Sequence, residues 1–403
     1  MKYKPIPKKR EKEFYKLLDY AFRPHKEEKS YENEEDYWPI VGGEFRGLFD
    51  RDDILSVSSI IPFSTVSRGK ETKMGGITTV ATPPEYRSRG FVRAMLKKLL
   101  GELRDRRIYL SVLWPFSYPF YNKLGWSRSQ DVINYSMDPS ILKREDPGNS
   151  GGLFRVNSGE YDLIEPAYLK YVKKFNLPLK RWNDWWDEHI MNHWKINNYC
   201  YGWKDEGRVR SYVLYHIEEG SGEEWKRKMI VDEMVFEGRT SFSQLLSFLY
   251  SHSSQAHEIL IRAPFSEEMP FHHVFDDPRE VEVTVKPGIM TRIVDVKMAL
   301  ESLSPPEELN GKLRILLRDP VLDFNQGTFD LEVGGGEIVY TRTDDDNPRP
   351  DVELDVNTLS QVYSGHLSIK QARFLNLKVN DEDKAEILED VFPPARVFFN
   401  EGF

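Results

Sequence analysis

A short basic segment, set between a strand-like apolar run and an amphipathic helix, carries the sharpest chemical signal in this sequence. Arg87, Ser88, Arg89 and Arg93 lie within seven positions around Gly90. Glycine lets a ligand approach the backbone closely. The N–H groups at a helix start lack intrahelical partners and form the positive end of the helix dipole. Together with guanidinium groups they predict a site for phosphate or pyrophosphate.

A second interpretation of this segment stays open. The arginines could form the solvated first turn of a surface helix that binds no ligand. Positive side chains at a helix N-terminus oppose the helix dipole, so this arrangement is unfavourable without an anion. The residue types therefore favour an anion site but do not exclude a plain surface turn.

The elements that must position this segment follow from hydrophobic periodicity. Residues 54–61 and 73–80 are predicted to be strands joined by a turn at 67–70. Five apolar residues recur at helical spacing after them: Val92, Met95, Leu96, Leu99 and Leu103. They predict a helix over 91–106, followed by a strand at 108–114. This order is a βαβ unit, so a parallel pair should lie inside a mixed sheet.

The rest of the chain divides into two further parts. After the Gly- and Pro-containing linker near residues 146–152, a second sheet-and-helix unit is predicted, with strands near 199–203, 209–217, 228–236 and 259–261. Its helix has no Arg/Gly loop before it. From about Lys286 the pattern is α+β, and a last helix stops at Pro393 before an aromatic tail. We expect three domains, 1–145, 146–285 and 286–403.

Length, cysteine content and charge exclude several classes of protein. The 403 residues include one cysteine, so we expect no disulfide, no metal site and a reducing, cytoplasmic location. Lys and Arg total 56 against 65 Asp and Glu, and the net charge of −9 disfavours a nucleic-acid partner. We expect no membrane partner, because no secretory signal or long apolar segment is present.

The basic segment resembles the acetyl-CoA-binding motif of the GNAT acetyltransferases, Arg/Gln-x-x-Gly-x-Gly/Ala, with Arg-Ser-Arg-Gly-Phe-Val at residues 87–92. The spacing to Phe-Tyr-Asn-Lys-Leu-Gly-Trp at residues 120–126, the length and the terminal Phe are similar to the Eis (enhanced intracellular survival) branch. The resemblance covers the whole chain. It implies an α+β fold with tandem GNAT domains, the second lacking the cofactor loop, and a sterol-carrier-protein-like domain.

The resemblance also implies roles for single residues. Backbone groups of Val80, Ala81 and Thr82 would hold the pantetheine of acetyl-CoA, and the loop from Arg87 to Arg93, Val92 included, would hold its pyrophosphate. Tyr121 corresponds to the general acid that protonates the departing thiolate. The terminal carboxylate of Phe403 corresponds to the base. These assignments suit the chemistry, since a carboxylate is ionised and a phenol protonated at neutral pH.

The acceptor is implied only as a class, a primary amine on a small cationic molecule or a lysine side chain. Phe22 and Trp38 correspond to pocket aromatics and Glu401 to a nearby acidic contact. An acidic run at residues 27–36 could attract a cation or could be a solvated helix. The resembled branch forms hexamers, so we expect a homo-oligomer.

Alternatives to these roles stay open. Tyr121 could be a core tyrosine in an aromatic cluster. The tail could serve only to dock the third domain, which its apolar sequence also explains. For the whole chain, the alternative is a lipid- or apolar-ligand-binding protein with a vestigial acetyltransferase unit. An apolar tunnel within residues 286–403 would favour that alternative.

Overall fold

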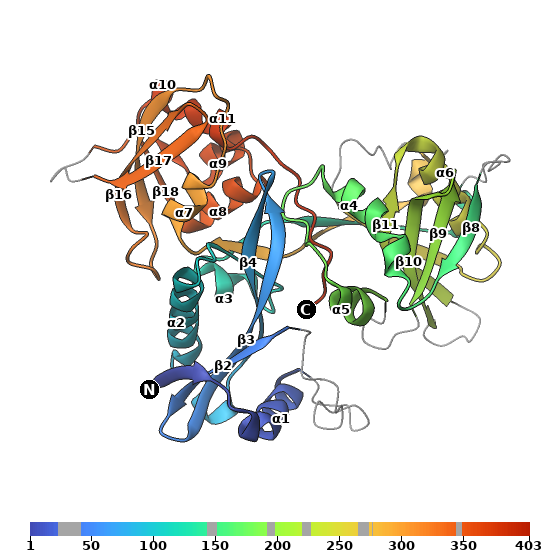
Figure 1. Ribbon diagram of the computed structural model, residues 1–403, viewed down its shortest axis with the longest axis horizontal. Coiled ribbons are helices and arrows are strands. Elements are labelled where there is room, and N and C mark those ends of the chain that lie inside the picture. The colour runs from blue at the N-terminus through green and yellow to red at the C-terminus, as the bar shows by residue number, and fades with distance from the viewer. Residues whose placement is uncertain are drawn as a thin grey trace. The chain divides into compact units, whose positions relative to one another are not determined.

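The computed structural model describes residues 1–22, 42–142, 151–191, 198–219, 227–264, 274–275, 277–343 and 349–403 (Figure 1). The chain forms two compact units. Unit 1 comprises Met1–Ser129, Ile289–Ala395 and Phe403, and unit 2 comprises Gln130–Gly288 and Arg396–Gly402. Within the described ranges, no helix is both long and apolar enough to cross a membrane.

The first sheet of unit 1 has the order β1-β2-β3-β4-β5-β14-β6. Its strands are β1 (Lys2–Pro5), β2 (Glu44–Asp50), β3 (Asp53–Ser67), β4 (Lys70–Ala81), β5 (Leu110–Leu113), β14 (Met290–Ile293) and β6 (Ser127–Arg128). The helices of this part are α1 (Glu11–Phe22), α2 (Phe91–Asp105) and α3 (Tyr118–Asn122). In the described part of this sheet, β4 and β5 are the only parallel pair, and α2 connects them, which confirms the predicted βαβ unit.

Helix α2 forms because its apolar residues share one face. Met95, Leu96, Leu99, Leu100 and Leu103 are all buried, whereas Lys97 and Lys98 between them are exposed. The buried stripe packs in a core with Ile60 of β3 and Ile77 of β4. The helix therefore lies on one face of the sheet, with its N-terminus beside the end of β4.

Two strands lie outside the domain boundaries expected from the sequence. β7 (Asp131–Met137) falls within the expected first domain but pairs with β12 (Glu258–Pro264) and β13 (Glu282–Pro287) of unit 2. β14 follows residue 286 but pairs with β5 and β6 of the first sheet. All four residues of β14 are buried, so this strand needs neighbours on both faces, which the first sheet supplies. Local patterns do not encode such distant partners.

Unit 2 contains the second sheet, of order β13-β7-β12-β11-β10-β9-β8. Its further strands are β8 (Gly152–Val156), β9 (Tyr199–Asp205), β10 (Arg208–Glu219), β11 (Arg227–Phe236), β12 (Glu258–Pro264) and β13 (Glu282–Pro287). Its helices include α4 (Glu165–Val172), α5 (Asn183–Trp185) and α6 (Gly238–Tyr250). β11 and β12 pair in parallel around α6, which confirms the predicted second sheet-and-helix unit.

The C-terminal part of unit 1 is a separate α+β fold. Its sheet has the order β17-β16-β15-β18-β19, formed by β15 (Gly311–Arg318), β16 (Gly327–Gly334), β17 (Glu337–Arg342), β18 (Val352–Asp355) and β19 (Lys378–Val379). The helices are α7 (Val296–Glu301), α8 (Val356–Ser364), α9 (Ile369–Leu375), α10 (Glu382–Ala385) and α11 (Ile387–Val391). The expected α+β class is thereby confirmed.

The turn of the β3–β4 hairpin fastens the first sheet to this C-terminal fold within unit 1 (Figure 1). Arg68 donates from Nε to the carbonyl of Tyr363 at 2.9 Å, from Nη2 to that of Val362 at 2.7 Å, and from Nη1 to that of Pro393. The last carbonyls of a helix such as α8 lack partners and carry negative partial charge. Burial lowers the pKa of Arg68 to about 10, so the side chain remains a cation at neutral pH.

Candidate active site

The candidate site begins where β4 and β5 part. β5 pairs with β4 only along Met74–Gly76, although β4 continues to Ala81. Residues Thr78, Thr79 and Val80 are half-buried on this strand. Their edge toward β5 has no strand pairing in the described sheet, so backbone N–H and C=O groups there are open to an extended ligand.

A β-bulge interrupts β4 at the same place. Val57 of β3 faces Ala81 and Ser59 faces Thr78, so one extra residue is accommodated in β4. Thr79 lies in the bulge with φ of +52°. This left-handed conformation is uncommon for a β-branched residue. Bulges and such strained residues gather at functional sites, where they redirect backbone groups.

Serine hydroxyls of β3 hold the bulged segment. Ser56 Oγ donates a hydrogen bond to the Ala81 carbonyl at 3.1 Å, and Ser58 Oγ donates one to the Thr78 carbonyl at 3.2 Å. A third hydrogen bond joins Ser59 Oγ and Thr79 Oγ1. All three serines are fully buried. A strained backbone persists only when its surroundings over-determine it. The three serines meet that condition, and the alternating Ser-Val-Ser-Ser of β3 is the only sequence signal for the bulge.

The predicted phosphate loop lies between β4 and α2. Arg87, Ser88, Arg89, Gly90 and Arg93 are all exposed. Ser88 has φ of +60° and Gly90 has φ of +79°, and alternation of this kind turns backbone N–H groups toward a common point. Gly90 starts α2 without a side-chain cap, and no atom lies within 4 Å of where a Cβ would be. The loop therefore presents backbone N–H groups and guanidinium groups that could bind an anion.

The arginines of this loop are partly tethered. Arg87 Nε donates to the Thr82 carbonyl at 3.2 Å, and its guanidinium lies 5.3 Å from the ring centre of Tyr20. Arg93 donates to the Pro320 carbonyl at 3.2 Å. These contacts use only part of each guanidinium, so donors remain for an anion.

Tyr121 lies in α3, which Ser117 caps by accepting from the Phe120 N–H. Tyr121 is 3% exposed and packs edge-on against Phe116 and Trp126, with ring centres 5.2 Å and 6.1 Å away. Burial raises its pKa, so the phenol is protonated at neutral pH. Tyr121 belongs to the core cluster against which Val80 and Val92 also pack. The structure therefore brings three predicted site residues around one core.

A buried arginine that sequence reasoning missed holds the segment of Tyr121. Arg292 of β14 donates to the Leu124 carbonyl at 2.6 Å and to the Asp319 carboxylate at 2.7 Å. Gly125 has φ of +90°, and a Cβ there would lie 1.3 Å from Arg292 Nη1. Glycine is therefore required at this position. The signal available in the sequence was one arginine inside the apolar run Met-Thr-Arg-Ile.

The C-terminal tail is packed, as its apolar sequence predicts. Phe398 and Phe399 are buried in unit 2, where the backbone of Asn176 exchanges hydrogen bonds with Arg396 and Phe398. In unit 1 the ring of Phe403 lies edge-on to Phe63 of β3, with centres 5.1 Å apart. The role of the Phe403 carboxylate stays a prediction.

Glu401 is fully buried in a charged cluster of unit 2. Its carboxylate accepts from Arg181 Nε at 3.0 Å and from Trp185 Nε1 at 2.8 Å. Arg181 also forms a two-pronged pair with Glu233, at 2.9 Å and 2.6 Å. One cation therefore faces two carboxylates. Burial raises the pKa of Glu401. At Glu233, Arg181 and the hydrogen bonds from Tyr212 and Asn400 together outweigh burial and lower the pKa.

The predicted acceptor residues are only partly described. Phe22 ends α1 and is 46% exposed, as a substrate-contacting aromatic must be. Trp38 and the acidic run at 27–36 lie outside the described residues. Cys200 of β9 is buried, and burial raises the pKa of its thiol. In the described ranges, no three His, Cys, Asp or Glu residues are grouped so that they could hold a metal ion.

Three domain families match consecutive parts of the chain. An acetyltransferase (GNAT) domain matches residues 2–129, and a second one matches residues 177–293. A sterol carrier protein domain matches residues 296–400. The first match contains the arginine loop and Tyr121.

Named relatives are similar over most of the chain. N-acetyltransferase Eis of Mycobacterium tuberculosis is 22% identical over 337 residues, which cover 79% of this chain and 77% of the relative. An uncharacterized N-acetyltransferase of Streptomyces avermitilis is 22% identical over 337 residues, 80% of each chain.

Solved structures share the fold over nearly the whole length. A probable N-acyltransferase from Enterococcus faecalis superposes with a TM-score of 0.84 at 22% identity, covering 98% of this chain and 96% of the other. Eis1 from Mycobacterium abscessus superposes with a TM-score of 0.78 at 17% identity, covering 100% of both chains.

The charged cluster of unit 2 yields a stability prediction. Arg181→Met leaves two buried carboxylates without their cation, and we expect a loss of about 3–5 kcal/mol in unfolding free energy. Glu401→Gln keeps an acceptor for Trp185 and removes one buried charge, so we expect a change below about 1.5 kcal/mol. Chemical denaturation measures both.

Arg262→Met provides the matched control, because Arg262 pairs with Asp232 at a partly exposed position. Such pairs contribute about 0–1 kcal/mol. If Arg181→Met cost no more than Arg262→Met, the cluster would not anchor the tail in unit 2.

Proposed function

Because this chain is an Eis-like N-acetyltransferase of the GNAT family with a C-terminal sterol carrier protein domain, we propose that its first GNAT domain moves an acetyl group from acetyl-CoA to a primary amine. The acceptor is a small cationic molecule or a lysine side chain. The observation that carries the proposal is the open, bulged edge of β4 beside the uncapped N-terminus of α2. The first turn of α6 in the second GNAT domain carries one arginine, Arg239.

The donor supplies a thioester, whose acyl carbon is open to attack by an amine. Arg87, Ser88, Arg89, Gly90 and Arg93 bind its pyrophosphate through guanidinium and backbone N–H groups. The backbone of Val80, Ala81 and Thr82 extends the edge of β4 along the pantetheine, and Val92 packs beneath the loop. An N–H group near Val80 polarises the thioester carbonyl, as a single-donor oxyanion site does.

Two groups of the chain move the protons. The Phe403 carboxylate accepts a proton from the amine, directly or through a water, as the new C–N bond forms. Tyr121 donates its phenolic proton to the thiolate that leaves when the C–S bond breaks. Burial raises the pKa of Tyr121, so the phenol is protonated at neutral pH, as a proton donor must be before the reaction.

The acceptor side is proposed on charge and aromatic character. Phe22 and Trp38 would stack on a cationic amine. The net charge of −9 favours such a substrate. Glu401 is the acidic residue nearest Phe403 in the sequence, but its bonds to Arg181 and Trp185 support a holding role in place of substrate contact.

The cellular location and the oligomeric state are proposed from the resemblance to the Eis branch. We propose a cytoplasmic homo-oligomer, with a hexamer as the expected size. Exposed Val283 and Val285 on the edge strand β13 supply apolar surface that a subunit contact would cover.

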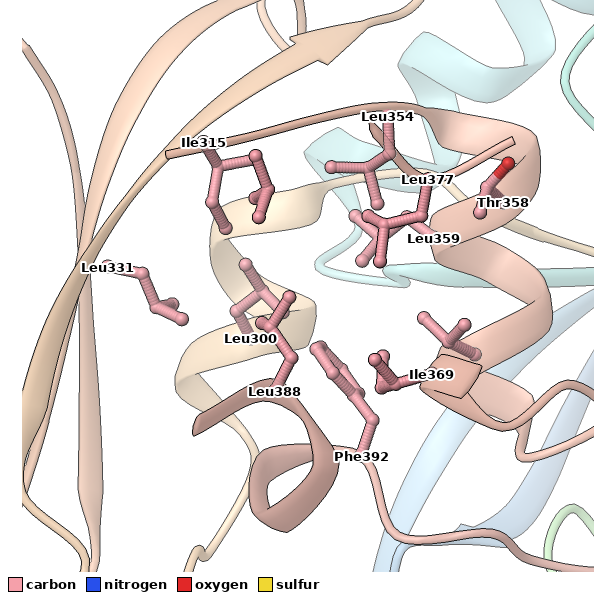
Figure 2. Close-up of a pocket in the computed structure, with 12 residues that line it drawn as sticks. Leu300, Ile315, Leu331, Leu354, Thr358, Leu359, Ile369, Leu377, Leu388 and Phe392 are labelled. Carbon is pink, nitrogen blue, oxygen red and sulfur yellow. The ribbon is translucent and has the colours of Figure 1, made fainter. Parts of the chain in front are cut away.

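A cavity in the C-terminal domain bears on the lipid-binding alternative (Figure 2). Its wall is apolar except for the Thr358 hydroxyl, and it includes Leu300, Ile315, Leu331, Leu354, Leu359, Ile369, Leu377, Leu388 and Phe392. The space open to the centre of a water molecule is about 10 Å³, enough for one water. Sites for small organic ligands measure about 300–1,000 Å³. Because the open volume of this cavity is far below that range, the structure favours the enzyme over a lipid carrier.

The donor assignment predicts one acetyl-CoA site per chain by titration calorimetry. We expect Arg87→Glu combined with Arg89→Glu to weaken binding at least about tenfold, because two cations that face the pyrophosphate become anions. Arg239→Glu, at the matching place in the second GNAT domain, should leave affinity unchanged. Two sites per chain would refute the assignment.

The general-acid assignment predicts that Tyr121→Phe lowers kcat about 10²-fold or more, while the KM for acetyl-CoA stays near its original value. The phenyl ring keeps the packing against Phe116 and Trp126. Tyr118→Phe, in the same helix, is the control and should retain turnover. Unchanged turnover in Tyr121→Phe would mean that this residue only packs the core.

The base assignment predicts that activity depends on the main-chain carboxylate of Phe403. Deleting Phe403, or extending the chain beyond it, should abolish acetyl transfer with the thermal midpoint nearly unchanged. Converting the carboxylate to a carboxamide by protein ligation keeps the ring on Phe63 and should also abolish transfer. Phe403→Leu retains the carboxylate and should retain activity. A C-terminally tagged protein with full activity would place the base elsewhere.

A further inference from the structure

A second cleft of unit 1 lies at the C-terminal end of α2, where that helix meets the C-terminal domain. Its volume is about 290 Å³, at the lower end of the range for small-ligand sites, about 300–1,000 Å³. Arg104 lines it from the last turn of α2, and the loop at Gly90 starts the same helix. At 1.5 Å per residue these positions are about 20 Å apart. The cleft is therefore separate from the proposed donor site.

Aromatic rings line this cleft. Phe329 of β16 and Tyr340 of β17 stack with ring centres 4.6 Å apart and planes 15° apart. The guanidinium of Arg104 lies 3.9 Å from the ring centre of Phe324, and that of Arg342 lies 5.3 Å from the ring centre of Phe329. The rings and the guanidinium groups cover faces of one another, so the cleft offers mainly ring edges to a planar ligand group.

The Tyr340 hydroxyl provides an unsatisfied polar group at the cleft. Tyr340 is 2% exposed, and no described residue forms a hydrogen bond with its hydroxyl. Burial raises the pKa of Tyr340, on which the cleft residues Arg342 and Asp295 also act electrostatically. A buried hydroxyl without a partner costs about 1–3 kcal/mol. A ligand atom that accepts from this hydroxyl would recover that energy.

The charges around the cleft favour an anion. Arg104 is paired with Asp295 at 2.8 Å, and Lys297 is paired with Glu301 at 2.8 Å. Arg342 donates to the Gln326 carbonyl, but within the described ranges it has no carboxylate partner. Its positive charge is therefore not balanced by a carboxylate of the described residues.

A glycine fixes the place of Arg342. Gly327 has φ of +143°, and a Cβ there would lie 2.6 Å from Arg342 Nη2. A side chain at residue 327 would displace the end of Arg342 from this place across the ring of Phe329. The cation is thereby held beside the stacked rings.

We propose that this cleft binds a small aromatic carboxylate, with its ring against the Phe329–Tyr340 stack and its carboxylate at Arg342 and the Tyr340 hydroxyl. The proposal stands on the cleft alone and is independent of the acetyl-transfer assignments. None of the residues assigned to donor, acceptor or catalysis lines this cleft.

Titration of the full chain with 2-naphthoate tests the proposal. We expect one saturable site per chain. Arg342→Ala should weaken binding at least about tenfold and Tyr340→Phe about fivefold, since each removes one contact with the carboxylate. Arg373→Ala, an arginine outside the cleft, is the control and should bind like the original chain. Saturating acetyl-CoA should not change the affinity.

The cationic analogue 2-naphthylmethylamine has the same ring and should bind at least about tenfold more weakly. Equal affinity for both probes would show binding by the ring alone and overturn the proposal. Competition by acetyl-CoA, or no saturation below about 1 mM, would also overturn it. Tyr340→Phe retains the stacked ring and removes the unsatisfied hydroxyl, so its thermal midpoint should not fall, and its affinity decides the question even if Arg342→Ala fails to fold.

Discussion

The fully buried ion pair between Arg292 and Asp319 is the constraint on which unit 1 depends. Removing two charges from water costs several kcal/mol for each ion, so the pair persists only with good geometry and further hydrogen bonds. Arg292 meets this condition by donating to the Leu124 carbonyl, and Gly125 leaves the space that its guanidinium occupies. Tyr121 lies four residues before Gly125. A strand from the last residues of the second GNAT match thus holds the segment that contains the proposed general acid of the first GNAT domain.

Local sequence patterns predicted most of the helices and strands. The apolar stripe of α2, the β3–β4 hairpin and the βαβ order were all predicted, because each depends on neighbours within about 30 residues. The bulge at Thr79 was missed, since Ile-Thr-Thr-Val is an ordinary strand sequence and the extra residue exists only relative to the register of β3. The pairing of β7 and β14 in sheets outside their expected domains was missed for the same reason. An apolar run indicates that a strand is buried but not which strand it pairs with.

Some residues of the candidate site could likewise be predicted from local sequence, and others could not. The arginine loop could be predicted from residue types, because a helix N-terminus and guanidinium groups suit an anion wherever they occur together. Tyr121 could not, since a buried phenol has the same sequence signature whether it packs or donates a proton; only the resemblance selected it. The buried cluster of Arg181, Glu233 and Glu401 joins residues up to 220 positions apart, and no spacing rule reaches that far.

The same cluster gives a physical reason for a main-chain carboxylate to serve as the proposed base. A base must be held near hydrogen-bond distance of the proton it removes, and each residue ordered for this purpose costs about 1–2 kcal/mol of backbone entropy. Buried Phe398, Phe399 and Glu401 already fix the tail on folding. Only Gly402 separates Glu401 from Phe403. A terminal carboxylate has no side-chain rotamers, so little freedom remains to be lost when the base engages its substrate.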